Sequence, residues 1–119
     1  MLQQGIDIAG LFYENGYHFI YNDKFELLDT DVQAFIVLHE LGHMELGHLL
    51  IPDIAQERIL RAKMGYAHSS ELEADSYAAS IVGKKVSAKA LKAQIEWAID
   101  LAKPELEFRI REVSRRKED

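Results

Sequence analysis

The sequence HELGH at residues 39–43 places two histidines four positions apart, with a glutamate directly after the first. Four residues correspond to about 400° of rotation in an α-helix, so His39 and His43 leave the same face one turn apart. Two imidazoles in this arrangement can reach one metal ion at about 2.0–2.1 Å, and the carboxylate of Glu40 can contact a water on that ion. The pattern therefore requires a helix here and predicts two metal ligands, His39 and His43, with Glu40 as a general base.

The residues around this pair fit a buried helix better than a helix with scattered polar side chains. Residues 35–38 are apolar and predict a buried approach to the histidines, and Gly42 leaves one flank of the helix without a side chain. Thr30 with Gln33 makes a capping-box pattern, so we expect the helix to run from about residue 31 to residue 50. Small residues in a later segment would let a second helix pack closely against this one: Ala74, Ala78 and Ala79.

The rest of the chain predicts a small α+β domain. The pair Asn15-Gly16 lies between aromatic and apolar runs, which is a strong hairpin signal, so we expect strands over about residues 8–14 and 17–22. A length of 119 residues fits one domain, 1–119, without a repeat or a linker. We expect four further helices: from a cap at Asp53 to residue 63, from residue 71 to a stop at Gly83 with Ser70 and Glu73 as capping box, over 87–103, and from Pro104 into the charged tail.

Composition limits the chemistry that the chain can carry. There is no cysteine, so any metal must be held by His, Asp or Glu, and the chain suits a reducing compartment. The net charge of -6 argues against nucleic acid as a partner. No apolar run approaches the ~20 residues that a membrane span needs, and the N-terminus lacks the pattern of a signal peptide. We therefore expect a cytoplasmic protein.

A catalytic zinc ion usually takes three protein ligands, so a third ligand is needed. His48 follows His43 by five residues, which on a continuous helix is about 140° around the axis, so we expect it to be a structural or outer-sphere residue. Glu71 and Asp75 are four apart on a predicted helix, where Glu71 can ligate and Asp75 can accept a hydrogen bond from a ligand imidazole. Glu73 lies about 200° from Glu71 and is assigned to the capping box. Acidic residues also stabilise the N-terminus of any helix through the helix dipole. The spacing alone therefore leaves open whether Glu71 is a metal ligand or an ordinary first-turn carboxylate.

HELGH followed by ELEAD at residues 71–75 resembles the gluzincin pattern HExxH…ExxAD. In that group the first glutamate of the second motif is the third zinc ligand and the aspartate stabilises a ligand histidine, which implies these roles for Glu71 and Asp75. Residues 12–113 are similar to the HtpX and CAAX-prenyl-protease peptidases, in which a histidine at the place of His48 also recurs. Those enzymes carry transmembrane helices, which this chain lacks, and commonly have histidine where this chain has Lys103.

A chain of this size looks most like the minigluzincins, the minimal versions of that peptidase domain. The resemblance implies a zincin-like metallopeptidase domain with Zn2+ as cofactor and a peptide or protein as substrate. It also implies latency, because a terminal segment can block the cleft in that group. We therefore hypothesise a zinc-dependent endopeptidase, in which the strand at residues 17–22 could pair with an extended substrate. Four side chains are candidates for an additional oxyanion or substrate donor: Tyr66, His68, Tyr77 and Arg109.

Two alternatives remain. The ImmA/IrrE-type peptidases share HExxH and an ExxAN/D motif and cleave repressors, but they usually continue into a Leu-Leu-Met-Pro-like stretch where this chain has residues 80–83, Ser-Ile-Val-Gly. A non-catalytic zinc-binding or partner-regulated module is the other alternative, although a purely structural site has no use for Glu40. The charged tail, residues 114–119, either covers the cleft or frays, and we expect fraying. The sequence does not specify the substrate, the cleavage specificity or the oligomeric state.

Overall fold

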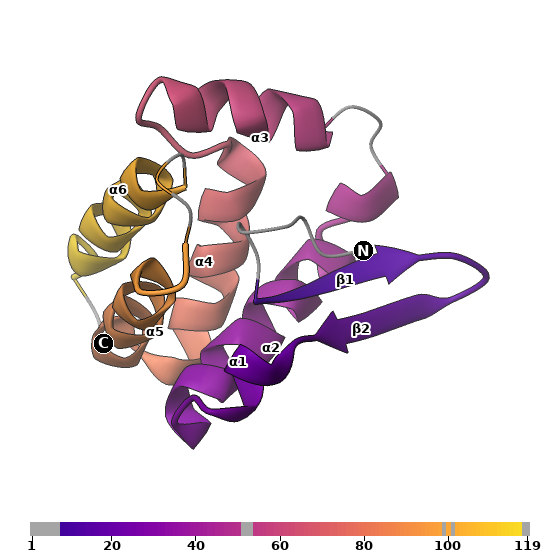
Figure 1. The fold of residues 1–119 in the computed structure, drawn as a ribbon, viewed down its shortest axis with the longest axis horizontal. Coiled ribbons are helices and arrows are strands. Elements are labelled where there is room, and N and C mark those ends of the chain that lie inside the picture. The colour runs from indigo at the N-terminus through magenta and orange to yellow at the C-terminus, as the bar shows by residue number, and fades with distance from the viewer. Residues whose placement is uncertain (1–7, 51–53, 99, 101, 118–119) are drawn as a thin grey trace.

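A short β-hairpin opens the described part of the chain, and six α-helices follow it (Figure 1). The computed structural model describes residues 8–50, 54–98, 100 and 102–117. The elements are β1 (Ala9–Tyr13), β2 (Tyr17–Tyr21), α1 (Asp23–Glu26), α2 (Thr30–Glu45), the 3-10 helix η1 (His48–Leu50), α3 (Ile54–Lys63), α4 (Ser69–Val82), α5 (Lys84–Ile95) and α6 (Lys103–Ser114). This arrangement confirms the predicted small α+β domain.

The hairpin turns at the predicted pair. Asn15 adopts φ 54° and Gly16 adopts φ 134°, a region that asparagine and glycine tolerate best. The strands are antiparallel, with Tyr13 opposite Tyr17 and Ala9 opposite Tyr21. β1 packs against both α2 and η1 (Figure 1). β1 is therefore a strand that packs against the helix that carries HELGH.

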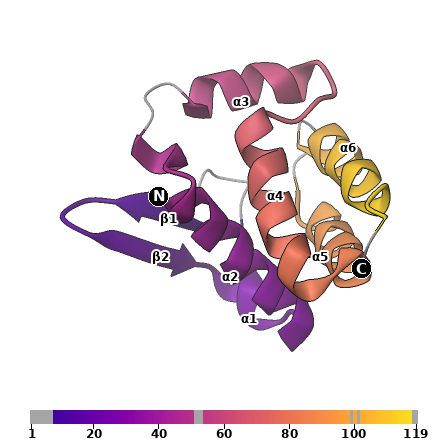
Figure 2. The ribbon, with the colours of Figure 1, turned by 180° about the vertical axis from the view of Figure 1, so that it is seen from behind.

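Close packing between α2 and α4 organises the helical part, and the two helices lie side by side in both views (Figure 2). Ala74 and Ala78 of α4 are fully buried. A Cβ atom on Gly42 of α2 would lie only 3.1 Å from Cβ of Tyr77 and 3.2 Å from Cα of Ala74. A side chain at this position would therefore force its neighbours to shift by a few tenths of an ångström, and the predicted close packing of the two helices is confirmed.

The apolar core lies where α5 packs against α2 and α4, and α6 packs against α4 and α5 (Figure 1). Fully or nearly fully buried side chains from three helices meet there: Val32, Phe35 and Ile36 of α2, Ala90 and Leu91 of α5, and Leu106 and Val113 of α6. Burying such side chains provides most of the free energy that holds a small domain together. The polar ends of α2 and α4 can therefore carry residues that do not contribute to the apolar core.

The helix that carries the two histidines is shorter than predicted. α2 ends at Glu45, and Gly47 then adopts φ 74°, in the left-handed region that favours glycine. The chain turns there and enters η1. The predicted continuous helix to residue 50 is wrong, and His48 does not lie on the same helix as His43.

The helix caps also differ from the predicted capping boxes. Asp29, not Thr30, precedes α2 as its N-cap residue, and its side chain makes no capping hydrogen bond. α4 is capped by His68, whose Nδ1 accepts a hydrogen bond of 3.0 Å from the backbone N–H of Ser70. The predicted capping box of Ser70 and Glu73 is therefore wrong, and the Glu73 carboxylate is used elsewhere.

The bounds of α5 and the position of the tail also differ from the prediction. α5 begins at Lys84 and ends at Ile95, so the predicted helix over residues 87–103 is shifted, and α1 was not predicted. The proposed cap at Asp53 lies outside the described residues.

The tail is anchored rather than frayed as far as Arg116. Nη1 of Arg116 donates to Ser76 Oγ at 2.8 Å, and the backbone carbonyl of Arg116 accepts from Lys84 Nζ at 2.9 Å. No helix among the described residues is long and apolar enough to cross a membrane.

We predict that Gly42→Ala destabilises the protein. The added methyl group meets backbone and Cβ atoms that cannot move independently, and such overpacking costs about 1–3 kcal/mol, against a gain of about 1 kcal/mol in helix propensity. We therefore expect the free energy of unfolding, measured in urea, to fall by up to about 2 kcal/mol. Ala34→Gly is the control: it makes the opposite exchange at an exposed position of α2, so it measures the difference in helix propensity between alanine and glycine without a packing contribution. A Gly42→Ala protein more stable than wild type would show that the two helices are not in this close contact.

Candidate metal centre

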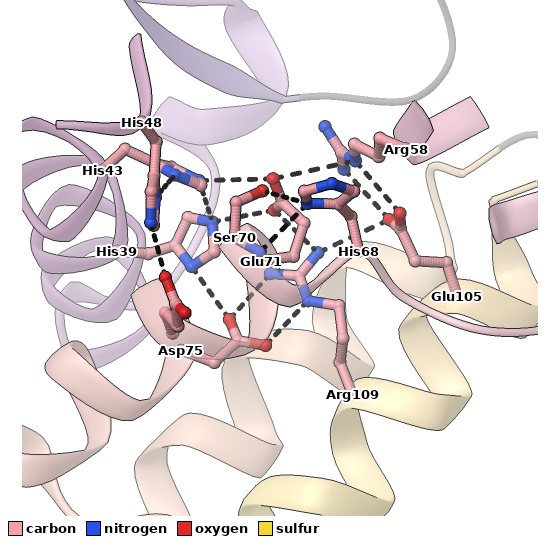
Figure 3. Close-up of polar contacts among 11 residues, drawn as sticks. His39, His43, His48, Arg58, His68, Ser70, Glu71, Asp75, Glu105 and Arg109 are labelled. Atoms are coloured by element: carbon pink, nitrogen blue, oxygen red, sulfur yellow. Dashed lines mark hydrogen bonds and ion pairs between the residues drawn. The ribbon is translucent and has the colours of Figure 1, made fainter. Parts of the chain in front are cut away.

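Three side chains from two helices converge at one place in the structure (Figure 3). α2 presents His39 and His43 one turn apart, and the first turn of α4 presents Glu71. The Nε2 atoms of His39 and His43 lie 3.1 Å apart, and His39 Nε2 lies 3.1 Å from Glu71 Oε1. His43 Nε2 lies 3.3 Å from Glu71 Oε2. All three residues are buried, so the structure brings together the three ligands that the two sequence motifs predicted.

These distances fit a divalent metal ion. Ligand atoms from His39, Glu40 and His43 lie within 4.8 Å of one another, and this group could hold a metal ion. A tetrahedral ion with bonds of about 2.0–2.1 Å holds its ligand atoms about 3.3 Å apart, which is close to the separations among His39, His43 and Glu71. Glu40 is half-buried on the same helix. Two imidazoles and a carboxylate are also a donor set that divalent transition metals accept.

His39 is held from behind by a buried ion pair. Its Nδ1 lies 2.8 Å from Oδ1 of Asp75, so the far side of the ring faces a carboxylate while Nε2 faces the other ligands (Figure 3). Arg109 of α6 donates two hydrogen bonds of 2.8 Å to the same carboxylate. Burial lowers the pKa of His39, but Asp75 and Glu71 outweigh burial and raise the pKa to about 10. In the absence of a metal, His39 is therefore protonated and ion-paired.

His43 is held from behind by another histidine. The Nδ1 atoms of His43 and His48 lie 2.8 Å apart, and Nε2 of His48 lies 2.7 Å from Oε1 of Glu73. His48 is 7% exposed and reaches this position because the chain turns at Gly47. The predicted displacement of His48 around a continuous α2 is thus wrong, although His48 does lie outside the triangle of ligand atoms.

A second layer of charges surrounds Glu71. Arg58 of α3 donates two hydrogen bonds of 3.0 Å to Glu105 of α6, and its Nε lies 3.8 Å from Glu71 Oε2. Arg109 Nη1 lies 3.6 Å from both Glu71 and Glu105. Burial raises the pKa of Glu71, but Arg58 and the two ligand histidines outweigh it and hold this pKa well below its usual range. Glu71 is therefore an anion at neutral pH and is ready to bind a cation.

Two of the four candidate donors lie on or beside the turn that precedes α4. Tyr66 is exposed, and its ring packs edge-on against Phe108 with ring centroids 5.6 Å apart. His68 caps α4, and its Nε2 lies 2.9 Å from Oε2 of Glu57 in α3. Both side chains thus have structural contacts of their own. Among the described residues, neither ring makes a hydrogen bond or an ion pair with His39, His43 or Glu71.

The other two candidates lie on helices that frame the centre. Tyr77 packs against the flank of α2 that Gly42 leaves open, so the structure gives it a packing contact. Arg109 is 3% exposed and is held in the ion pair with Asp75. Since its Nη1 also approaches Glu71, the contacts of Arg109 are those of a residue that orients ligands.

Sequence reasoning missed three residues of this network. Glu73 had been assigned to a cap, and Arg58 and Glu105 had not been considered. Arg58 and Glu105 are 47 positions apart, and no local spacing connects them. The available signal was only that a chain with a buried Arg109 and a buried Glu71 needs further charges nearby, because unpaired buried charges are costly.

Neither models of protein families, nor curated proteins, nor solved structures match this chain. The gluzincin resemblance accordingly remains a prediction from the two motifs.

We predict a specific pH dependence for the metal-free protein. Because the folded-state pKa of His39 is raised from 6.5 to about 10, its stabilising contribution is fully present below pH 6.5 and is lost as the pH rises toward 10. The free energy of unfolding in urea with a chelator should therefore fall over this range. Asp75→Asn should flatten the dependence as well as lower stability. Metal should bind more tightly as the pH rises, since it competes with this proton.

Metal-free stability that stays level or increases between pH 6.5 and pH 10 would contradict the coupling between His39 and Asp75.

Proposed function

We propose that the chain is a zinc-dependent endopeptidase in which His39, His43 and Glu71 hold the ion and Glu40 acts as general base. One observation carries the proposal: the three ligand atoms lie 3.1–3.3 Å apart at the junction of α2 and α4, with the Glu40 carboxylate in the same group. The resemblance of HELGH and ELEAD to the gluzincin motifs supports the same assignment.

The ligand number supports a catalytic site over a structural one. Structural zinc sites take four protein ligands, whereas catalytic sites take three and leave one position for water or substrate. The two imidazoles and the carboxylate of Glu71 make three. His48 is within contact of His43 but has both ring nitrogens engaged, one by His43 and one by Glu73, so it is not available as a fourth ligand.

The roles of the side chains follow from their positions. A bound zinc ion lowers the pKa of a coordinated water towards about 7 and polarises a carbonyl group. Glu40 follows His39 directly on α2, so its carboxylate can accept the proton of that water and return it to the leaving amine. Asp75 and Arg109 hold the ring of His39 in orientation from behind.

The neighbouring strand supports a peptide as the substrate. β1 packs beside α2 and η1, and among the described residues its strand partner is β2 alone. The opposite edge of β1 carries backbone N–H and C=O groups that an extended peptide can pair with. Such pairing would be largely independent of side chains, in keeping with an endopeptidase that acts on unstructured protein.

We predict that Glu40→Gln abolishes peptidase activity without abolishing zinc binding. The amide cannot act as a base, and loss of a general base typically lowers kcat/KM about 10²–10⁴-fold. Cleavage of an unstructured protein is followed by gel and mass spectrometry, and bound zinc is measured on the same preparations. Glu45→Gln, an exposed change of the same charge on α2, should leave activity unchanged. Zinc-loaded wild type and Glu40→Gln with equal activity, or with none, would contradict the proposal.

We further predict that removing residues 115–119 does not activate the enzyme. Arg116 is anchored to Ser76 and Lys84, and the C-terminal end of α6 lies beside α5, away from the end of α4 that carries Glu71 (Figure 1). The kcat/KM of the truncated chain should therefore match that of the full chain. A large rise after truncation would show that the tail covers the cleft and confers latency.

A further inference from the structure

Two side chains outside the ligand triangle connect His43 to the protein surface. His48 lies between His43 and Glu73, with contacts of 2.8 Å and 2.7 Å. His48 is 7% exposed, whereas the Glu73 side chain is 58% exposed. We infer that His48 and Glu73 form a relay that fixes the tautomer and orientation of His43 and thereby sets the metal affinity of the site.

The contacts determine where the protons lie on the neutral rings. A carboxylate only accepts hydrogen bonds, so Nε2 of His48 must donate to Glu73. Nδ1 of neutral His48 is then an acceptor, and Nδ1 of His43 must donate to it. The Nε2 atom of His43 is left without a proton, and this is the atom that faces His39 and Glu71. One assignment of the neutral rings therefore satisfies the contacts of His43 with His48 and of His48 with Glu73, and it presents the lone pair of His43 to the metal.

The turn between α2 and η1 brings His48 into contact with His43. α2 stops at Glu45, and Gly47 at φ 74° turns the chain so that η1 begins with His48 against His43. The two rings meet with centroids 5.1 Å apart at 67°. Glu73 comes from α4, so the relay joins the end of α2, η1 and α4. A side chain other than glycine at residue 47 would be strained in this turn.

The two ligand histidines are therefore supported unequally. His39 contacts a buried carboxylate, Asp75, which Arg109 holds in place. His43 is supported through an imidazole by a carboxylate that water can reach. The metal affinity should consequently respond to a change at Glu73, a surface residue that contributes nothing to the apolar core. Loss of such an outer partner typically lowers metal affinity about 10–100-fold.

The relay is tested by zinc affinity, measured by competition with a chelator of known affinity. We expect Glu73→Gln to bind zinc more weakly, towards the low end of that 10–100-fold range, because the charge behind His48 is removed. His48→Phe should weaken binding across the full range, since it keeps a planar aromatic ring but removes both polar contacts. His48→Asn, which can still accept from His43, should lie between His48→Phe and wild type. Glu45→Gln is the matched charge control and should bind zinc as wild type does.

A second measurement separates positioning from a merely structural role. Long-range proton–nitrogen spectra of the zinc-loaded wild type should show His43 protonated at Nδ1 and bound through Nε2. Circular dichroism confirms that each variant is folded, and Glu73→Gln keeps the test valid if His48→Phe does not fold. The relay is overturned if Glu73→Gln and Glu45→Gln bind zinc equally, or if His43 carries its proton on Nε2.

The inference rests on the proposed function only in requiring that a metal binds at this centre. Zinc affinity is measured without any peptide turnover. A chain that binds zinc with the expected order of affinities but cleaves no peptide refutes the peptidase and supports the relay. A chain that cleaves peptides in a Glu40-dependent manner, with equal zinc affinity in all variants, overturns the relay alone.

Discussion

The close approach of α2 to α4 is the contact on which the rest of the site depends. Gly42 allows it, because a Cβ atom there would lie 3.1–3.2 Å from Tyr77 and Ala74, and Ala74 is fully buried at the junction. The same approach brings the first turn of α4 to the histidines of α2, so that Glu71 lies 3.1–3.3 Å from both imidazoles. A larger residue at Gly42 would force its neighbours on α4 to shift by a few tenths of an ångström and so disturb the arrangement of these atoms. Packing of the core and formation of the candidate site are therefore one structural event.

The charges at this junction are tolerated because each is matched. Removing an ion from water costs several kcal/mol unless opposite charges and hydrogen bonds replace its hydration. Here Asp75 has both Arg109 and His39, and Glu105 has both Arg58 and Arg109. These pairs bring residues from α3 and α6 to a centre formed by α2 and α4. Part of the network that satisfies the buried charges, Arg109 with Asp75, thus also holds the ring of His39.

The sequence was informative where local geometry decides the outcome. Residues four apart on a helix share a face whatever the remainder of the fold, so His39 with His43 and Glu71 with Asp75 could be predicted, as could the turn at Asn15-Gly16. The break after Glu45 could not, because residues up to His48 continue a helical pattern and only Gly47 marks the turn. Contacts such as Arg58 with Glu105 depend on how distant helices pack, and no spacing in the sequence records that. The expected role of His48 outside the ligand set stays a prediction, and the continuous helix on which it was argued is contradicted by the turn at Gly47.

We propose that His39, His43 and Glu71 together hold one metal ion while His48 supports the site from outside. X-ray absorption at the zinc edge of the zinc-loaded chain reports the ligands directly. We expect one zinc per chain with two imidazoles and a carboxylate oxygen at about 2.0–2.2 Å, and Glu71→Gln should alter the oxygen contribution alone. A spectrum with three imidazoles, which would bring His48 into direct coordination, or one unchanged by Glu71→Gln, would show that this ligand set is wrong.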